Sequence, residues 1–411
     1  MEKNEQKIKL LVCFIQAHMG GAMTSLVNFL NALDTDKYDV DVIFYENGES
    51  RYGIKESINI LGQGKIHESY NLKNILTKAL SPRYCAALVL DRYYKHIRHN
   101  KKKAVQIMSK QGCRYSRRLD KEYDICVAYE INWSLNYMIQ YVHAKKKIAW
   151  RHLEYEKAGM DYRIDKKAFD ASDAIVFVSD AGLEDYKREH PENKDKSYFI
   201  PNLLSSAYVR ERGEETVPDD VPFPITEKEL KLLTVARIDF GHKGFDRAVE
   251  AFSRLNEKGL LKDVKWMIIG EGRDLPALRQ MIADNGLGDV IYTIGARENP
   301  IPYMKYFDVF FLPSRYEGKP MAVTEGYIMG LVPVVTEYAS ANEQIKNGYD
   351  GLVFGNNDEA LYAGLEQLFK APGIISELKE NIKQNDYGNE KDIVYFDKLA
   401  ERLLRDSISA D

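Results

Sequence analysis

Two glutamates, Glu317 and Glu325, are separated by seven residues in the stretch PSRYEGKPMAVTEGYIMG, residues 313–330. Glu317 follows an apolar segment that is typical of a buried strand. Pro320 suits the first turn of a helix, because the N–H that proline lacks would have no partner there. We therefore expect a helix to begin near Lys319 or Pro320, with Glu317 in the loop before it and Glu325 on its body.

These carboxylates and the backbone between them have the chemistry to bind hydroxyls and anions. Each carboxylate can accept hydrogen bonds from two hydroxyls of a sugar or a ribose. The free N–H groups of residues 318–321, at the start of the predicted helix, favour an anion or further hydroxyls. The alternative is that Glu317 caps the helix and that Glu325 is a solvated residue on its face.

Two cations lie close together in VARIDFGHKGFDRAVEAF, residues 235–252. Arg237 ends an apolar segment typical of a strand, and six residues later Lys243 is expected to open a helix. Gly241 and Gly244 permit a tight turn between the two elements. Two fixed cations beside a helix N-terminus can neutralise a diphosphate without a metal ion. The alternative is a pair of solvated surface charges.

Both motifs lie at the ends of apolar runs that alternate with helical patterns. This alternation indicates parallel sheets covered by helices, and open parallel sheets bind ligands at the carboxyl ends of their strands. A chain of 411 residues exceeds the size at which a single core stops growing, about 250–300 residues. We therefore predict an α/β protein with two Rossmann-like domains that face a central cleft. The expected strands are residues 8–16, 38–46, 123–130, 147–152, 174–180 and 197–202, and then 230–237, 264–272, 290–295, 309–315, 332–337 and 351–354.

The alternation breaks over residues 203–229, where Pro218, Pro222 and Pro224 lie close together. We expect an N-terminal domain over residues 1–203, a linker over 204–229 and a C-terminal domain over 230–390. The amphipathic segment IVYFDKLAERLLR predicts a final helix, and we expect residues 391–411 to pack back on the first domain.

Charge is distributed unevenly along the chain. The formal net charge is −4, but residues 92–118 hold ten Lys or Arg and no acid. Apolar and tyrosine side chains are interleaved with these positive charges from Ala86 onward. A helix of this kind can lie on an anionic membrane surface, and the alternative is a solvated basic face without a partner. No nucleic-acid recognition motif accompanies the charge, so we expect no nucleic-acid partner.

The remaining composition indicates a cytoplasmic protein. Four cysteines are dispersed without a CxxC pair, which predicts reduced thiols and neither a disulfide framework nor a zinc site. No apolar run reaches the ~18–20 residues that span a bilayer, and the start MEKNEQKIKLLVCFIQ is too charged for a signal peptide. We expect a cytoplasmic location, with peripheral contact at the inner face of the cell membrane.

With these motifs the chain resembles the retaining, nucleotide-sugar-dependent glycosyltransferases of the GT-B fold, of the bacterial surface-polysaccharide type. The resemblance covers nearly the whole chain. Besides the two motifs above, it rests on Gly20-Gly21 after the first strand, FIPN at 199–202, IIGEG at 268–272, TIGA at 293–296 and NGYDGLVF at 347–354.

The resemblance implies a role for each matching residue. Arg237 and Lys243 would hold the donor diphosphate and stabilise the leaving group. Glu325 would bind the ribose hydroxyls, and Glu317 would lie near the transferred sugar. His152 would reach the sugar from the first domain, although it can also be a strand-end histidine without a ligand.

Further residues would contact the donor mainly through their backbone or beside the base. Gly21 would let the backbone approach the donor phosphate or the acceptor. The amides of Gly318, Lys319, Pro320 and Met321 would contact the sugar or the phosphates, excepting the proline nitrogen, and Ala296 and Arg297 fall where the family reads the base.

The resemblance implies a retaining transferase that moves a sugar from a nucleoside diphosphate, UDP in our expectation, to a glycan acceptor, which can be lipid-linked, in cell-surface polysaccharide synthesis. No cofactor or metal is expected, because the only Asp-x-Asp, Asp39 and Asp41, opens the second strand and is interpreted as structural. The chain departs from the family at Lys319, usually apolar or aromatic, and at ASANEQI, residues 339–345, which replaces a glycine-rich segment before Glu343.

Two alternative functions differ in class. A sugar-nucleotide epimerase can have the same fold, but the paired glutamates argue against it. A non-catalytic homologue that stabilises a partner transferase is the other alternative. The presence of Arg237, Lys243, Glu317 and Glu325 together argues against an inactive protein.

Overall fold

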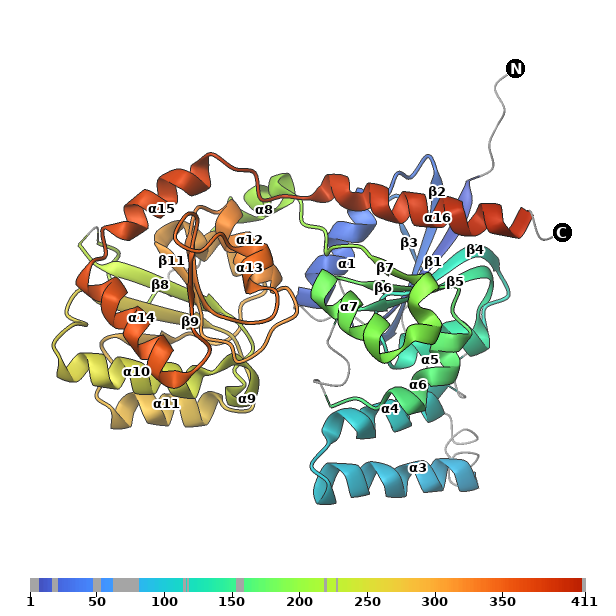
Figure 1. Cartoon of the computed structure of the whole chain (residues 1–411), viewed down its shortest axis with the longest axis horizontal. Helices are drawn as coiled ribbons and strands as arrows, with labels where there is room; N and C mark the ends of the chain where they lie inside the picture. Colours follow the sequence, from blue (N-terminus) through green and yellow to red (C-terminus); the bar gives the residue numbers. More distant parts are fainter. Residues whose placement is uncertain are drawn as a thin grey trace. The chain divides into compact units, whose positions relative to one another are not determined.

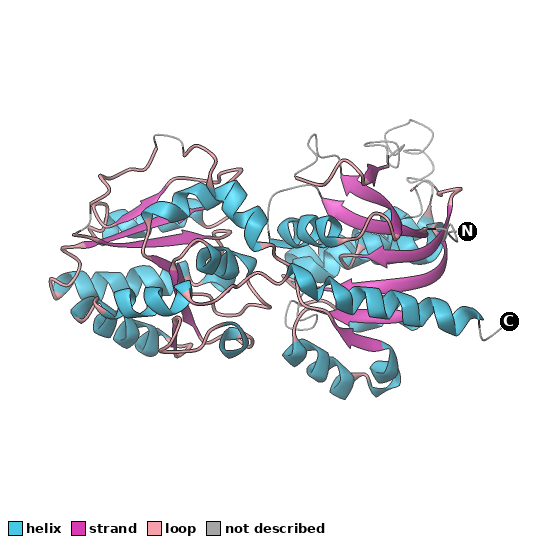
Figure 2. Cartoon of the chain, turned by 90° about the horizontal axis from the view of Figure 1, so that it is seen from above, coloured by secondary structure: helices cyan, strands magenta, loops and turns pink. Residues whose placement is uncertain are grey.

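The computed structural model describes residues 7–16, 21–46, 53–61, 81–113, 116, 118–152, 159–217, 220–226 and 228–408. The chain divides into two compact units, one of residues 1–203 with 391–411 and one of residues 204–390. Each unit contains a parallel sheet with helices on both faces (Figures 1 and 2). Both are Rossmann-like α/β domains, which confirms the predicted fold class.

The first unit contains a seven-stranded sheet of order β3-β2-β1-β4-β5-β6-β7. Its strands are β1 (Ile8–Gln16), β2 (Tyr38–Glu46), β3 (Asn59–Ile60), β4 (Glu122–Ala128), β5 (His143–Arg151), β6 (Ala174–Phe177) and β7 (Ser197–Phe199). Its helices are α1 (Gly21–Ala32), α3 (Pro82–Arg92), the π-helix η2 (Tyr93–Ile97), α4 (Lys101–Gly112), α5 (Trp133–Tyr141), α6 (Tyr162–Asp170), α7 (Asp180–Glu189), the 3-10 helix η4 (Pro191–Lys196) and α16 (Ile393–Ile408).

Both faces of the first sheet are buried, which explains its continuous apolar strands. On one face the ring of Phe29 in α1 packs edge-on against Phe396 in α16 and against Trp150 in β5. Lys37 and Tyr38 add polar contacts to Asp397 of α16. The C-terminal helix therefore belongs to the first unit through both apolar and charged contacts.

The second unit contains a six-stranded sheet of order β10-β9-β8-β11-β12-β13. Its strands are β8 (Leu230–Val235), β9 (Val264–Ile269), β10 (Ile291–Thr293), β11 (Val309–Leu312), β12 (Val332–Thr336) and β13 (Leu352–Phe354). Its helices are α8 (Ser206–Gly213), α9 (Phe240–Lys243), α10 (Phe245–Glu257), α11 (Leu275–Asp284), α12 (Met321–Ile328), α13 (Ala341–Gln344), α14 (Asp358–Lys370), α15 (Ile374–Lys383) and the 3-10 helices η5 (Ile301–Tyr306) and η6 (Glu390–Asp392).

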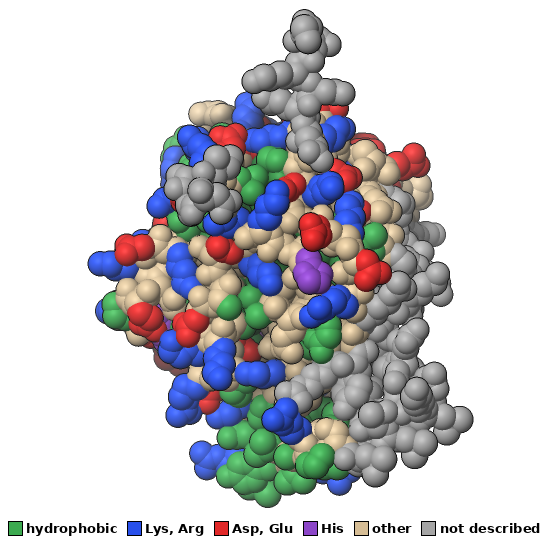
Figure 3. Space-filling model, turned by 90° about the vertical axis from the view of Figure 1, so that its right-hand side faces the viewer, with side chains coloured by type: hydrophobic (Ala, Val, Ile, Leu, Met, Phe, Trp, Pro, Cys, Tyr) green, Lys and Arg blue, Asp and Glu red, His purple; other side chains and the backbone are tan. Residues whose placement is uncertain are grey.

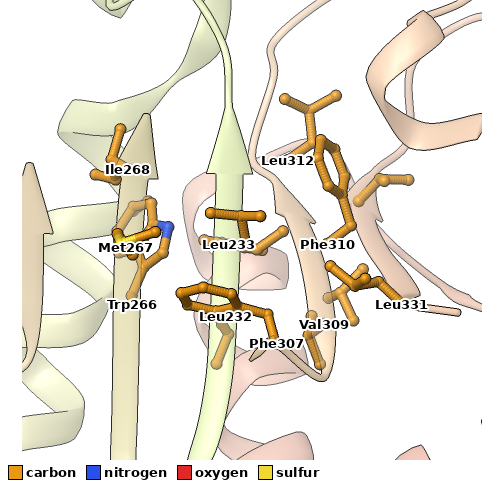
Figure 4. Close-up of a cluster of buried hydrophobic side chains, with 14 of the residues drawn as sticks. Leu232, Leu233, Trp266, Met267, Ile268, Phe307, Val309, Phe310, Leu312 and Leu331 are labelled. Carbon is orange, nitrogen blue, oxygen red and sulfur yellow. The ribbon is translucent and has the colours of Figure 1, made fainter. Parts of the chain in front are cut away.

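The core of the second unit joins its central strands to the covering helices. Figure 4 shows part of it, with Leu232 and Leu233 of β8 between Trp266 of β9 and Phe310 of β11. These side chains have no measurable exposure. Burial on this scale fixes the carboxyl ends of β8 and β11, which are the strands that precede the two sequence motifs.

Residues 204–229 differ from the linker that we expected. They are part of the second unit, and Ser206–Gly213 form the helix α8. Ser206 Oγ lies 2.5 Å from Asp386 Oδ1, and the backbone of Leu204 donates to Asn389. The proline-rich composition therefore marks the edge of a domain and not a free connection.

Candidate functional site

Glu317 lies in the loop between β11 and α12, and its carboxylate is buried in an ion pair. Oε1 accepts hydrogen bonds from Lys243 Nζ at 2.5 Å and from Ser314 Oγ at 2.6 Å. Oε2 lies 3.5 Å from His242 Nε2. Burial alone would raise the pKa of Glu317, but Lys243 and His242 lower it to about 2. Glu317 is therefore ionised near neutral pH, and the alternative of a capping role is wrong, because the N-cap of α12 is Pro320 and α12 has no side-chain cap hydrogen bond.

Helix α12 begins at Met321, and Pro320 is its N-cap residue. The expected start near Lys319 or Pro320 was thus one residue early, because Pro320 has an extended backbone. Gly318, Lys319 and Pro320 form the short connection from Glu317 to this helix. Two side chains from the segment after β12 hold the connection: Ser340 donates to the Gly318 carbonyl, and Gln344 donates to the Pro320 carbonyl at 3.1 Å.

Glu325 lies within α12 and is 7% exposed, so the alternative of a solvated helix residue is wrong. In the described part of the chain we find no hydrogen bond or ion pair to its carboxyl group. Burial raises the pKa of Glu325 to about 7, with a smaller opposing effect from the charge of Arg212. A buried carboxyl group without a partner can accept a ligand's hydroxyl hydrogens.

The two predicted cations have different surroundings. Arg237 follows β8 and is exposed, and no side-chain contact to it was found among the described residues. Lys243 is the last residue of the short helix α9 and pairs with Glu317. We expected Lys243 to open the long helix, but it does not. Gly244 adopts a left-handed backbone (φ 67°) and is the N-cap residue of α10, which begins at Phe245. A Cβ at Gly244 would overlap the Pro313 carbonyl, so this turn requires glycine.

Ala296 and Arg297 follow β10, and the Arg297 side chain is already engaged. Its guanidinium contacts Asp220 and lies 3.2 Å from the Tyr303 hydroxyl, and Nη1 donates to the Ala296 carbonyl at 2.9 Å. Reading of a base by Arg297 would therefore require it to share or exchange these contacts. The role implied for these two residues stays a prediction.

His152 follows β5 in the first unit. Its ring packs against Tyr129, with ring centroids 4.8 Å apart, and is nearly parallel to the ring of Trp150. Burial lowers the pKa of His152 to about 4, against hydrogen bonds to the Tyr129 backbone and the Asn202 side chain. The imidazole is therefore neutral near pH 7. Its Nε2 atom is buried and has no hydrogen-bond partner among the residues that the structure describes. A neutral ring that donates from its other nitrogen presents Nε2 as an acceptor.

A polar network holds the surroundings of His152. Ser25 Oγ lies 2.8 Å from both Asn202 Oδ1 and Tyr129 OH. Gly21, the other site residue predicted in this unit, is the exposed first residue of α1. Gly20 lies outside the described residues.

The Asp-x-Asp pair has the structural role that we expected. Asp41 is buried and accepts hydrogen bonds from Tyr123 OH at 2.8 Å, Lys121 Nζ at 2.9 Å and Asn59 Nδ2 at 2.7 Å. Across the described ranges, no three His, Cys, Asp or Glu side chains gather as metal ligands would.

Four residues of the second unit were missed by sequence reasoning. Ser314 and His242 contact Glu317, and Ser340 and Gln344 hold the loop that follows it. His242 also stacks on Tyr316, with ring centroids 4.2 Å apart. For Ser340 and Gln344, the only signal in the sequence was the departure from the family pattern at residues 339–345.

Comparison with known proteins finds a family match within the second unit and more distant matches along nearly the whole chain. Residues 219–388 match the profile described as "Glycosyl transferases group 1". An uncharacterized glycosyltransferase of Haemophilus influenzae is 24% identical over 90% of this chain and 94% of its own length. A Campylobacter jejuni enzyme is 24% identical over 92% of this chain and 93% of its own. That enzyme is named GalNAc-alpha-(1->4)-GalNAc-alpha-(1->3)-diNAcBac-PP-undecaprenol alpha-1,4-N-acetyl-D-galactosaminyltransferase.

A solved structure supports the fold over the whole chain. HepE of Anabaena, crystallised in complex with UDP and glucose, superimposes with a TM-score of 0.65 and 13% identity, covering 98% of this chain and 100% of that one. The two Rossmann-like domains are those of the GT-B fold. Residues 219–388 are similar to the group 1 glycosyltransferases, and the relatives that match nearly the whole chain are themselves named as glycosyltransferases.

Proposed function

We propose that this glycosyltransferase moves the sugar of a UDP-sugar donor to a lipid-linked glycan. The anomeric configuration is retained, and the product belongs to the synthesis of a bacterial surface polysaccharide. The pairing of Lys243 with buried Glu317 carries the proposal. A nucleotide sugar has hydroxyls on the sugar directly beside its phosphates. The pair offers a hydroxyl acceptor beside a cation, which suits that junction.

The remaining contacts follow from the residues around this pair. Arg237 and Lys243 neutralise the charge that develops on the diphosphate when the sugar departs. Glu325 accepts the ribose hydroxyls, and Glu317 accepts hydroxyls of the transferred sugar. Within the first unit, the Nε2 atom of His152 is an acceptor suited to a sugar hydroxyl.

Two glutamates assigned to binding leave no carboxylate nucleophile in this scheme. The acceptor oxygen therefore bonds to the anomeric carbon on the face from which the diphosphate oxygen departs. Its proton passes to the departing phosphate oxygen, so the charges balance. Because the two cations neutralise the leaving group, we also propose that the reaction needs no divalent metal.

The donor and acceptor classes are drawn from the relatives. HepE is described in complex with UDP and glucose, and the Campylobacter enzyme is named for a glycan on undecaprenol diphosphate. These names support UDP as the nucleotide and a polyprenol-linked glycan as the acceptor. We do not carry over a particular sugar from these names. Lys319 lies in the loop that is proposed to contact the sugar, and the family usually has an apolar or aromatic residue at this position.

We expect UDP to stabilise the protein in a thermal-shift assay that contains EDTA. A ligand that binds only the native state stabilises it by about 2.7 kcal/mol at one hundred times its Kd. A panel of nucleoside diphosphates and UDP-sugars should show the largest shift with UDP or one UDP-sugar. Chromatography of that UDP-sugar after incubation should then show slow release of UDP.

Each alternative gives a different result in the same assay. An epimerase would convert the UDP-sugar to an isomer without releasing UDP, and a non-catalytic partner protein would leave it unchanged. Turnover that appears only when magnesium or manganese replaces the EDTA would refute the metal-free mechanism.

Membrane contact is the second part of the proposal, and its basis is the surface of α3, η2 and α4. Val89 and Ile97 are each 67% exposed, and Leu88, Leu90 and Val105 are also exposed. Figure 3 shows hydrophobic side chains gathered at the lower end of the molecule with Lys and Arg side chains beside them, at the level of α3 in Figure 1. No helix in the described ranges is long and apolar enough to cross a bilayer.

Within residues 92–118, some Lys and Arg side chains form ion pairs or hydrogen bonds and others do not. Lys103 pairs with Asp161 at 2.6 Å and Lys95 pairs with Asp91 at 2.9 Å. Lys110 donates to a backbone carbonyl. In the described part of the chain, four exposed basic side chains of this segment make no contact: Arg92, Arg98, Lys101 and Lys102. Arg114 and Arg117, which also belong to the basic segment, lie outside the described residues.

We expect the double reversal Lys101→Glu/Lys102→Glu to weaken binding to vesicles of phosphatidylglycerol and phosphatidylcholine at least tenfold. Each basic residue near an anionic surface contributes about 1 kcal/mol, and salt should weaken the wild-type interaction. Co-sedimentation measures the binding. Lys103 is left unchanged because its ion pair with Asp161 is structural.

The control reverses Lys187 and Arg188 on α7 of the same unit; Lys187 is half-buried, Arg188 is exposed, and each pairs with an acid three residues earlier. It should bind vesicles like the wild type, and both double variants should retain UDP-sugar hydrolysis. Absence of wild-type binding to anionic vesicles at low salt would mean that the basic face is solvated and that the acceptor is met in solution.

A further inference from the structure

The loop between Glu317 and α12 is fastened by two side chains of one neighbouring segment. Ser340 is 1% exposed, and its hydroxyl donates to the Gly318 carbonyl. Gln344 Nε2 donates to the Pro320 carbonyl at 3.1 Å and to Thr324 Oγ1 at 2.8 Å. The carbonyls of Gly318 and Pro320 therefore face the segment of residues 338–344.

The orientation of the Gln344 amide is itself fixed. Tyr338 OH donates to Gln344 Oε1 at 3.0 Å. With Oε1 occupied as an acceptor, the Nε2 end of the amide faces the loop. Tyr338 and Gln344 thus form one hydrogen-bonded pair beside the start of α12, and Ser340 holds the loop separately through the Gly318 carbonyl.

The directions of these carbonyls determine where the adjacent N–H groups point. A trans peptide is planar, and its C=O and N–H bonds point to opposite sides. The Gly318 carbonyl shares a peptide with the Lys319 N–H, and the Pro320 carbonyl shares one with the Met321 N–H. Both N–H groups therefore point away from Ser340 and Gln344. No acceptor for either was found in the described part of the chain.

We propose that Ser340 and Gln344 are positioning residues that turn the N–H groups of Lys319 and Met321 toward the phosphates of the nucleotide donor. The inference rests on the proposed function, because that function supplies the diphosphate. Neither side chain touches the donor in this scheme. Preorganised backbone N–H groups at the first turn of a helix are suited to phosphate oxygens and need no reorganisation on binding.

The segment that departs from the family pattern thereby acquires a role. The serine and glutamine of ASANEQI supply two directed donors. Ser340 precedes α13, a helix of only one turn, and Gln344 ends it. This single turn sets the spacing between the two hydrogen bonds to the loop.

The test compares UDP with uridine, which has the ribose and the base but no phosphate. We expect Ser340→Ala and Gln344→Met each to weaken UDP binding at least fivefold, measured by calorimetry. Uridine affinity should change less than twofold, because Glu325 is unaltered. Hydrolysis of a UDP-sugar should slow at least tenfold. Ser376→Ala, an exposed serine on α15, is the control and should match the wild type in all three measurements.

The outcomes separate the inference from the proposed function. If the wild type binds UDP and both variants bind it equally well, the positioning role is refuted. An equal loss of UDP and uridine affinity would also refute it, because that result indicates general damage to the loop. If the wild type neither binds UDP nor hydrolyses a UDP-sugar, the proposed function fails. Two chemically different variants guard against misfolding of either one.

Discussion

Replacement of Arg237 by alanine should abolish most sugar transfer and leave the fold intact. Arg237 is exposed, and no contact to its side chain was found in the described ranges. Exposed substitutions without such contacts usually change stability by less than about 0.5 kcal/mol. Loss of one preorganised donor to a developing negative charge typically lowers kcat by about 10²–10³. Single-turnover hydrolysis of a UDP-sugar and a thermal melt measure the two effects.

Lys243 should behave differently, although the two cations look equivalent in the sequence. Lys243→Ala would leave the Glu317 carboxylate buried without its main partner, and breaking a buried pair costs about 3–5 kcal/mol. This variant should lose both turnover and stability. The double variant Lys243→Met/Glu317→Gln removes both charges, so it should regain most of the stability while turnover stays lost.

The two results together separate catalysis from folding. Arg279, another arginine of the second unit, donates to Thr293 Oγ1 at 3.0 Å, and Arg279→Ala should keep wild-type turnover. A folded Arg237→Ala variant with wild-type kcat would exclude Arg237 from the mechanism. Recovery of turnover in the Lys243/Glu317 double variant would exclude the pair.

Most of the fold is predictable because both sheets are buried on two faces. Parallel strands covered by helices form continuous apolar runs, and each expected run overlaps a strand, although β5 begins at His143, before the expected residues 147–152. The boundaries are less predictable where a local cap competes with strand pairing. Residues 174–180 read as one strand, but β6 ends at Phe177 because Ser179 caps α7 through the Gly182 N–H. The two-residue β3 is too short to produce an alternating pattern.

The site was predictable in its residue types but not in its pairing. Glu317 and Lys243 are 74 residues apart, and no local pattern specifies that they form an ion pair. The left-handed turn at Gly244 determines it, because that turn ends α9 with Lys243 at its last position. The support from Ser340 and Gln344 likewise depends on how β12 lies beside β11, a tertiary relationship.

Uridine should bind more tightly as the pH rises through 7, because Glu325 must be ionised to accept two ribose hydroxyls well. Burial holds the pKa of Glu325 at about 7 in the free protein. If only the ionised fraction binds, apparent affinity increases about tenfold from pH 6 to pH 8. Hydrogen bonds from the ribose favour the charged form, so binding releases a proton near pH 7. Uridine carries no phosphate charge that would obscure this effect.

The same residue should limit the stability of the free protein. Its pKa is raised from 4.5 in the unfolded chain to about 7, so the folded state holds a proton that the unfolded state loses. This contribution to stability is fully present below pH 4.5 and is lost as the pH rises through 7. The difference corresponds to about 3 kcal/mol. Glu325→Gln, which is neutral at every pH, should therefore be more stable than the wild type at pH 8 by up to that amount and equal to it near pH 4.5.

Glu325→Gln thus should gain stability at pH 8 while it loses uridine affinity and the pH dependence of that affinity. Denaturant melts and calorimetry at pH 6 and pH 8 measure both effects on the same samples. Glu377→Gln, at an exposed position on α15, provides a control that changes the same carboxyl group away from the site. Wild-type uridine affinity in Glu325→Gln would show that the ribose binds elsewhere. A melt unchanged at pH 8 would show that the carboxyl group is solvated in solution, since burial is the source of both expected effects.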